Sequence, residues 1–219
     1  MSSEPGPGGH RRDTYHHGDL HHALVVQGLD LARTGGAGAV ILREATRRAG
    51  VSPNAAYRHF TNREALLDEV SLEAARKLGA AMTEAADRAR EEAADADPRQ
   101  RGTDVLVAAC RAYIDFALSE TGWFDVAFAE SPEALRRLDE SGQGRKGLPS
   151  GVVADLVNEE GLPWATSIDP HDLEVLLLSV IHGLSVLITA GPLRNTDRDA
   201  LAERMLTLIR SSVLGATKG

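Results

Sequence analysis

Apolar residues recur along this chain at three- and four-residue intervals, which is the spacing of one face of an α-helix. Leu20, Leu24 and Leu31 lie on the first such stripe, and further stripes follow to the end of the chain. The pattern predicts helices over about 20–34, 42–49, 53–59, 63–95, 103–119, 123–129, 132–139, 150–160, 170–190 and 196–214. No convincing pair of strands is visible. We therefore expect an all-α fold of about nine or ten helices.

Residue types at the helix ends support these boundaries. Asp19 is placed to cap the first helix, Ser52 with Pro53 behind it begins the third, and Asn62 begins the long fourth. Gly50 supplies a sharp turn between the second and third helices, because only glycine enters left-handed backbone conformations cheaply. Two short helices joined by such a turn predict a helix-turn-helix, whose second helix enters the major groove of DNA.

Charge is distributed unevenly along the chain, whose formal net charge is −8. From residue 10 to residue 63, eight arginines stand against four acidic residues, whereas residues 71–219 hold 16 basic and 24 acidic residues. A basic head on an acidic body indicates that the head meets a polyanion. The single Cys110 excludes an intrachain disulfide and fits a reducing cytoplasm. The longest apolar stretch, 175–188, is too short for a membrane span, and no signal peptide is visible.

The head carries an ordered series of motifs beyond the helix-turn-helix pattern. They read Tyr15-His16-His17-Gly18-Asp19-Leu20, Leu42-Arg43-Glu44, Gly50-Val51-Ser52-Pro53, Tyr57-Arg58-His59-Phe60 and Asn62-Arg63-Glu64-Ala65-Leu66-Leu67. This combination resembles the tetracycline-repressor (TetR) family of bacterial regulators over about residues 15–70. In that family the segment is a three-helix DNA-binding domain, and the remaining helices form a ligand-binding and dimerisation domain.

The resemblance implies a division of the chain into three parts. Residues 1–13 are rich in Gly, Pro and charge, and this composition predicts a disordered arm. A DNA-binding domain over 14–62 and a ligand-binding and dimerisation domain over 63–219 follow it. It further implies a cytoplasmic homodimeric transcriptional regulator that binds palindromic operator DNA. Repression is the family default, with release by a small-molecule effector.

The family pattern also assigns residues to the DNA interface. Pro53, Asn54 and Ala55 begin the recognition helix, where Asn54 would pair with an adenine edge and Ala55 would touch a thymine methyl. The other positions implied at the interface are Arg43, Thr46, Ser52, Tyr57, Arg58, His59 and Arg63. Arg63 would bind a phosphate at the start of the fourth helix. Thr46 replaces the usual Ala of the family, and its hydroxyl is expected to bond a preceding carbonyl.

The C-terminal half carries one further likeness. Ser179-Val180-Ile181-His182-Gly183 is similar to a Trp-Ser-x-x-His-Gly string of one TetR subgroup, with Leu178 in place of the Trp. That helix belongs to the dimer interface in the subgroup, so helices 170–190 and 196–214 are expected to form a four-helix bundle with their mates. Thr196 and Asp199 resemble a capping box at the start of the last helix. The alternative is that these apolar rows serve a core within one chain.

Aromatic residues make up only 4% of the chain, and several of them gather in its C-terminal half. Candidate linings of an effector pocket are Tyr113, Phe116, Trp123, Phe128 and His182. Such a lining favours an uncharged or mildly polar organic effector. The alternative is that these residues are plain core.

Other functions find less support. His16, His17, His21 and His22 suggest a metal site, but neither cysteine nor paired carboxylates converge with them, so we expect no metal or cofactor. No phosphate loop, nucleophile elbow or carboxylate pair indicates an enzyme or a catalytic residue. The remaining alternative is a helical interaction or ligand-sensing protein that does not bind an operator.

Overall fold

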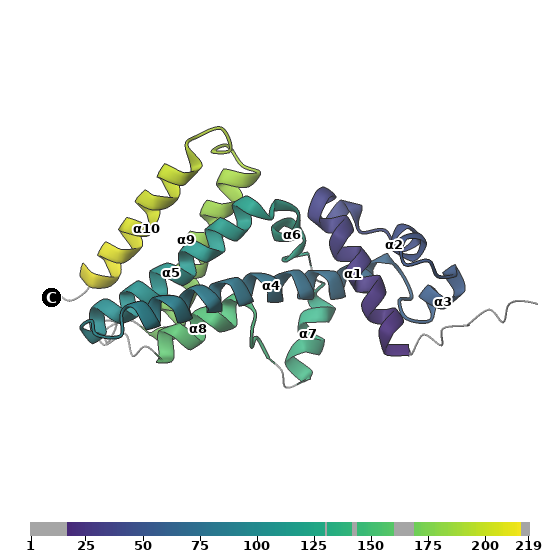
Figure 1. The fold of residues 1–219 in the computed structure, drawn as a ribbon, viewed down its shortest axis with the longest axis horizontal. Coiled ribbons are helices and arrows are strands. Elements are labelled where there is room, and N and C mark those ends of the chain that lie inside the picture. The colour runs from purple at the N-terminus through teal and green to yellow at the C-terminus, as the bar shows by residue number, and fades with distance from the viewer. Residues whose placement is uncertain (1–16, 130, 142–143, 160–168, 216–219) are drawn as a thin grey trace, which may run out of the picture.

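The computed structural model describes residues 17–129, 131–141, 144–159 and 169–215, and over these residues it contains helices and turns only. The predicted all-α fold is confirmed, while the arm predicted over 1–13 lies outside the described residues. The α-helices, labelled in Figure 1, are α1 (His17–Gly35), α2 (Leu42–Arg48), α3 (Pro53–Tyr57), α4 (Arg63–Glu92), α5 (Pro98–Ser119), α6 (Thr121–Val126), α7 (Pro132–Glu140), α8 (Pro149–Glu159), α9 (Pro170–Thr189) and α10 (Arg198–Gly215). A short 3-10 helix, η1 (Ala37–Ala39), lies between α1 and α2.

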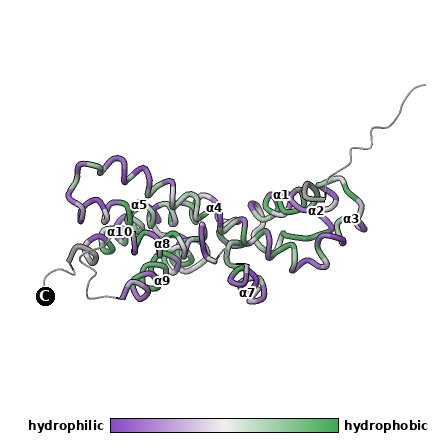
Figure 2. Tube along the Cα trace, turned by 90° about the horizontal axis from the view of Figure 1, so that it is seen from below, coloured by the Kyte–Doolittle hydropathy of each residue, from purple (hydrophilic) through white to green (hydrophobic). Residues whose placement is uncertain are grey.

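The helices form two lobes that share one long helix. The head holds α1, α2 and α3, and the body holds α5, α8, α9 and α10 (Figures 1 and 2). The 30 residues of α4 run through both lobes, a length of roughly 45 Å at the α-helical rise. Figures 1 and 2 also show α7 standing away from α4 as a separate short helix.

Each lobe has its own apolar core, and the two cores meet along α4. Leu66 and Val70 of α4 are buried in the head core with Leu24 of α1 and Phe60. From Leu78 onward α4 contributes to the body core instead. The first three turns of α4 therefore pack with the head, although the sequence suggests a boundary at 62.

Local capping signals are confirmed where they involve near neighbours. The Ser52 hydroxyl accepts a hydrogen bond from the Ala55 amide at 3.2 Å, and the Asn62 side chain accepts one from the Ala65 amide at 2.8 Å. Gly50 adopts a φ of 68°, which the turn between α2 and α3 requires.

Several predicted helix ends are wrong. Asp19 lies inside α1, which begins at His17. Asp97 caps α5 through the Arg99 amide, so that helix begins at Pro98 and not near residue 103. Asp197 accepts from the Ala200 amide at 3.0 Å at the start of α10.

The starts of α10 and α6 also differ from the prediction. Thr196 does not cap α10, because the helix begins at Arg198 and the Asp197 side chain directly before it accepts from the Ala200 amide; the Thr196 hydroxyl instead donates to the Leu193 carbonyl at 2.7 Å. The helix predicted over 123–129 begins earlier, at Thr121, and its Gly122 lies against the carbonyl end of α1.

The helix α9 is apolar around most of its circumference. Leu173, Leu177 and Ile181 are buried in the body core. The opposite side leaves apolar side chains exposed, namely Val175, Leu176, Val180, Val186 and Leu187. Among the described helices α9 alone is long and apolar enough to cross a membrane, which is weak evidence because core helices of soluble proteins pass the same test.

Candidate nucleic-acid interface and effector pocket

The recognition helix α3 presents a polar outer face. Its Ala56 is buried against the head core, so the helix has a fixed inner side. Pro53, Asn54 and Tyr57 are exposed on the remaining surface, and Arg58 is exposed at the C-cap. Tyr57 is 55% exposed, which is a high exposure for an aromatic side chain. This face has the side chains that a major-groove reader needs.

A shallow hollow of about 400 Å³ lies beside this face, between α2 and the start of α3. Arg43 and Pro53 line it, together with Ile41 and Arg47, which the sequence analysis did not single out. Ile41 is half exposed although it precedes the buried Leu42. Only the packing of the two helices shows that these residues border the outer face of α3.

Some of the charged side chains on α2 pair with one another. Glu44 accepts hydrogen bonds from Arg47 at 2.8 Å and from Arg48 at 3.0 Å. These bonds lower the pKa of the Glu44 carboxyl to about 2. Among the described residues neither Arg43 nor Arg58 takes part in an ion pair, so both guanidinium groups are available to phosphates.

Arg63 makes a different contact from the predicted one in this conformation. Its Nε donates to the Val40 carbonyl at 2.8 Å, and its Nη2 donates to the Ala37 carbonyl at 2.6 Å. These bonds tie the start of α4 to the turn between α1 and α2. A phosphate contact by Arg63 stays a prediction, and it would have to use the remaining N–H groups or replace these bonds.

The structure also shows the surroundings of three further residues predicted at the DNA interface, namely Thr46, Ser52 and His59. Thr46 is 4% exposed and its hydroxyl donates to the Leu42 carbonyl at 2.6 Å, which confirms the predicted bond to a preceding carbonyl. Its burial gives no support to a direct DNA contact. Ser52 is exposed and uses its hydroxyl as a cap, while His59 is half-buried with its ring 6.2 Å from that of His21.

The short helix α6 joins the body to the head. The Trp123 indole N–H donates to the Leu29 carbonyl at 2.9 Å, and the Asp125 carboxylate accepts from the Ala37 amide at 2.9 Å. Arg33 pairs with Glu120 at 2.6 Å beside them. None of these contacts has a local sequence signal, because the partners are about 90 positions apart.

Trp123 and Phe116 lie at this joint and not in the cavity wall. Their rings stack with centroids 6.4 Å apart, and Trp123 also lies under Arg33 at 4.8 Å and Lys77 at 5.3 Å. Neither residue lines the cavity described next. The Trp123 ring points toward the head, where its N–H finds a hydrogen-bond acceptor in the Leu29 carbonyl.

A cavity of about 530 Å³, partly open to solvent, lies between the body helices, α4 and α7, and its size suits a small organic molecule. Of the predicted pocket residues, Tyr113, Phe128 and His182 line it. The structure adds wall residues from three further segments and from the neighbours of Phe128 and His182, namely Ala75, Ala127, Leu138, Asp139, Arg145, Leu148, Pro149, Ser150, Leu178 and Ser179. They share no sequence pattern, so periodicity alone does not find them.

The polar centre of this cavity is a hydrogen-bonded pair. The Tyr113 hydroxyl lies 2.8 Å from Nδ1 of His182. Burial raises the pKa of Tyr113 and lowers the pKa of His182, so both groups are neutral at pH 7. If the phenol donates to Nδ1, then Nε2 of His182 carries the ring proton and is a hydrogen-bond donor. The Phe128 ring lies across His182 with its centroid 4.6 Å away.

The single cysteine is part of the body core. Cys110 is fully buried, and burial raises the pKa of its thiol to about 12. The thiol therefore packs as a small apolar group.

Comparison with known proteins agrees with this geometry. The family profile "Bacterial regulatory proteins, tetR family" matches residues 24–70, and the profile "Tetracyclin repressor-like, C-terminal domain" matches residues 106–209. No curated protein sequence is significantly similar to the chain.

Solved structures share the whole fold. A protein with unknown function from Rhodococcus sp. RHA1 is 25% identical with a TM-score of 0.65, over 92% of this chain and 97% of its own. A regulatory protein in the tetR family from Rhodococcus RHA1 is 23% identical with a TM-score of 0.57, over 88% and 96%. The TetR family repressor AlkX from Dietzia sp. strain DQ12-45-1b, implicated in biodegradation of n-alkanes, is 16% identical with a TM-score of 0.52, over 89% and 97%.

A helix-turn-helix head, a long shared helix and a helical body that borders a cavity define a two-lobed class of DNA-binding transcription regulators. The chain belongs to the TetR family of bacterial regulators. Members of this family bind operator DNA as homodimers, respond typically to small molecules and are generally not enzymes.

Proposed function

We propose that this protein is a homodimeric repressor that binds a near-palindromic operator through α3 and leaves it when a small organic effector enters the body cavity. The exposed polar face of Asn54, Tyr57 and Arg58 on a helix with a buried inner side is the observation that carries this proposal. A regulator of this kind acts on the chromosome, so we place it in the cytoplasm.

The dimer would form through the unpartnered apolar sides of α9 and α10. Leu176 of α9 and Leu208 of α10 are 55% and 56% exposed, which is costly for isolated leucines in water. A partner packed on these sides would bury them in a four-helix bundle. Two recognition helices would then meet successive major grooves about 34–36 Å apart on one face of the DNA.

Effector binding would reach the head by two routes that start at the cavity wall. Ala75 lines the cavity on α4, the helix that runs into the head core. Phe128 lines it just after α6, whose Trp123 and Asp125 bond the end of α1 and η1. An effector that moved either wall would change the angle of the head, and would act only if it bound the two states unequally.

The cavity favours a neutral or mildly polar ring-bearing effector. Tyr113, Phe128 and His182 supply aromatic surface, and His182 supplies one polar contact at their centre. A hydrogen-bond acceptor on the effector would meet the Nε2 proton of His182.

Retention of a random duplex library at about 0.15 M salt, followed by sequencing, tests the proposal. Asn54→Ala is expected to relax one position of the enriched site, with a loss of about 1–3 kcal/mol there. Arg43→Gln is expected to weaken binding to all sequences and to flatten the salt slope by about one unit. Arg88→Gln is the matched control, because it removes the same charge from an exposed position on α4 outside the head.

Enrichment of a palindromic site would support the dimeric repressor. If folded, dimeric protein enriched no site, or if Asn54→Ala and Arg88→Gln behaved alike, the assignment of the recognition helix would be wrong. The interaction-protein alternative would then be favoured.

A further inference from the structure

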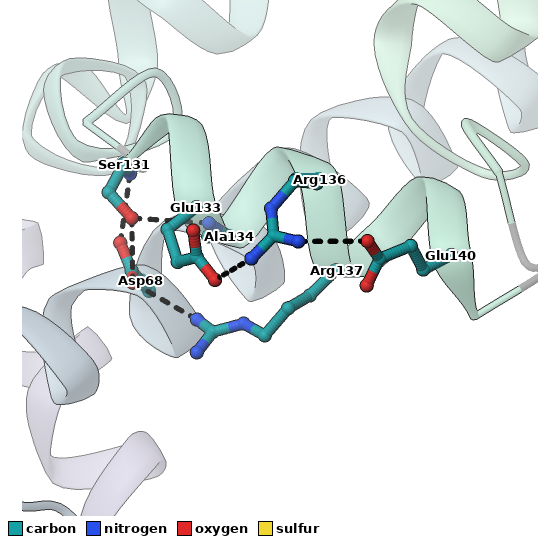
Figure 3. Close-up of polar contacts among 7 residues, drawn as sticks. All are labelled: Asp68, Ser131, Glu133, Ala134, Arg136, Arg137 and Glu140. Carbon is teal, nitrogen blue, oxygen red and sulfur yellow. Dashed lines mark hydrogen bonds and ion pairs between the residues drawn. The ribbon is translucent and has the colours of Figure 1, made fainter.

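Asp68 is a buried carboxylate that neither the DNA-facing surface nor the cavity wall uses. It is 9% exposed and lies on α4 between Leu66 and Val70, which are fully buried in the head core. A buried carboxylate is costly unless hydrogen-bond donors surround it. Among the described residues, every hydrogen-bond donor to the Asp68 carboxylate comes from α7 or its cap, as Figure 3 shows.

Three donors converge on the Asp68 side chain. The Ser131 amide donates to Oδ1 at 2.9 Å, and the Ser131 hydroxyl donates to Oδ2 at 3.0 Å. Nη2 of Arg137 donates to Oδ2 at 3.2 Å. The Ser131 hydroxyl also accepts from the Ala134 amide at 3.2 Å, so the residue that caps α7 is the one held by Asp68.

The helix α7 has little other attachment to the described part of the protein. No other helix packs closely along it, and it projects from α4 in both views (Figures 1 and 2). Arg136, the neighbour of Arg137, bonds only within α7, to Glu133 and Glu140 (Figure 3). The inner side of α7 nevertheless forms part of the cavity wall, through Leu138 and Asp139.

We infer that Asp68 is a positioning residue that latches α7 over the effector cavity, so that α7 is the wall through which the effector enters. The inference rests on the proposed effector cavity but not on DNA binding. Opening α7 would remove all three donors from Asp68, at a point of α4 that belongs to the head core. The latch thereby links occupancy of the cavity to the head end of α4.

Hydrogen exchange of the full-length protein, read by mass spectrometry, tests the latch. Asp68→Asn is expected to speed exchange of the α7 amides about tenfold, the size expected for losing a charge-assisted hydrogen bond. Arg137→Gln should do the same to a smaller extent, and it keeps the buried carboxylate if Asp68→Asn fails to fold. Arg136→Gln is the control, because it removes an arginine from the same helix without touching α4.

Entry into the cavity is measured with a thiol and an aromatic probe. Ser150 lines the cavity, and the thiol introduced by Ser150→Cys reports access of 5,5′-dithiobis(2-nitrobenzoate). The native Cys110 is a silent background because it is fully buried with its pKa raised to about 12. The latch predicts that Asp68→Asn speeds modification about tenfold and that Arg136→Gln leaves it unchanged.

Equal rates in Asp68→Asn and the unmodified chain would overturn the inference. So would an Asp68→Asn variant in which α4 and α7 exchange faster to the same extent, because Asp68 would then stabilise α4 and not the position of α7. Neither readout uses DNA. Failure of the library experiment with a positive latch would therefore reject only the repressor proposal.

Discussion

Gly122→Ala tests whether α6 holds the head through a close approach to α1. A Cβ at residue 122 would lie 2.2 Å from the Ala32 carbonyl oxygen and 2.3 Å from that of Arg33. Ordinary contacts between carbon and a carbonyl oxygen are about 3.3 Å or longer. The methyl group would therefore push α6 away from the end of α1 by about 1 Å, and backbone atoms on both sides leave little room to yield.

The expected cost follows from the bonds that this shift breaks. The bonds from Trp123 to the Leu29 carbonyl and from the Ala37 amide to Asp125 are both 2.9 Å. Lengthened by about 1 Å they exceed hydrogen-bonding distance, at a loss of about 1 kcal/mol each. Alanine in place of glycine inside a helix returns up to about 1 kcal/mol. We expect a net destabilisation of about 1 kcal/mol or more.

Thermal unfolding at fixed protein concentration measures the effect, which should lower the Tm by about 2–4 °C for a chain of this size. Gly38→Ala is the matched control, because a Cβ at residue 38 meets nothing within 4 Å and its φ is not positive. A Gly122→Ala variant as stable as the unmodified chain would show that the close contact between α6 and α1 is absent in solution.

Three further predictions concern pH, assembly and charge. Burial lowers the pKa of His182 below its ordinary 6.5, so the folded protein favours the neutral ring. The contribution of His182 to the free energy of unfolding is therefore complete above pH 6.5 and is lost as the pH falls through the lowered pKa. His182→Asn should therefore lose less stability than the unmodified chain on acidification from pH 6.5, and parallel unfolding curves would contradict this. Leu176→Glu should raise the dimer dissociation constant at least about 100-fold in sedimentation, because it buries a charge in an apolar interface. The control Ala80→Glu, on the exposed side of α4, should leave the dissociation constant unchanged. An intact Leu176→Glu dimer would show that the interface lies elsewhere. Glu44→Gln releases Arg47 from a carboxylate that is charged at any working pH. Binding to random DNA at low salt should therefore tighten, and the salt dependence of the affinity should steepen by about one unit. Unchanged binding would show that α2 lies away from the phosphates.

The sequence alone predicted the helical elements and the helix-turn-helix because their signals are local. Ser52 and Asn62 cap helices by bonding amides three residues ahead, and the left-handed turn at Gly50 depends on one residue. The local signal was misread at the start of α10, where Thr196 was predicted as the cap. There Thr196 turned back to the Leu193 carbonyl and Asp197 became the cap.

Site residues followed the same division. Pro53, Asn54 and Tyr57 could be placed on an outer face from helical periodicity and the family motif. The use of Arg63 could not, because its carbonyl partners lie 23 and 26 positions earlier in the chain. The sequence also could not show that Trp123 lies outside the cavity wall, because its hydrogen-bond partner Leu29 is 94 positions away.

The sequence by itself therefore determined the fold class, the recognition helix and the aromatic character of the cavity, because periodicity, caps and residue type act over a few positions. Only the tertiary structure decided which aromatic side chains face the cavity, which bonds join α6 to the head and which donors surround the buried Asp68. Those outcomes depend on donors and acceptors that meet once α4, α6 and α7 are packed together. A buried polar group must find such a partner, and nothing in its neighbouring residues states where that partner lies.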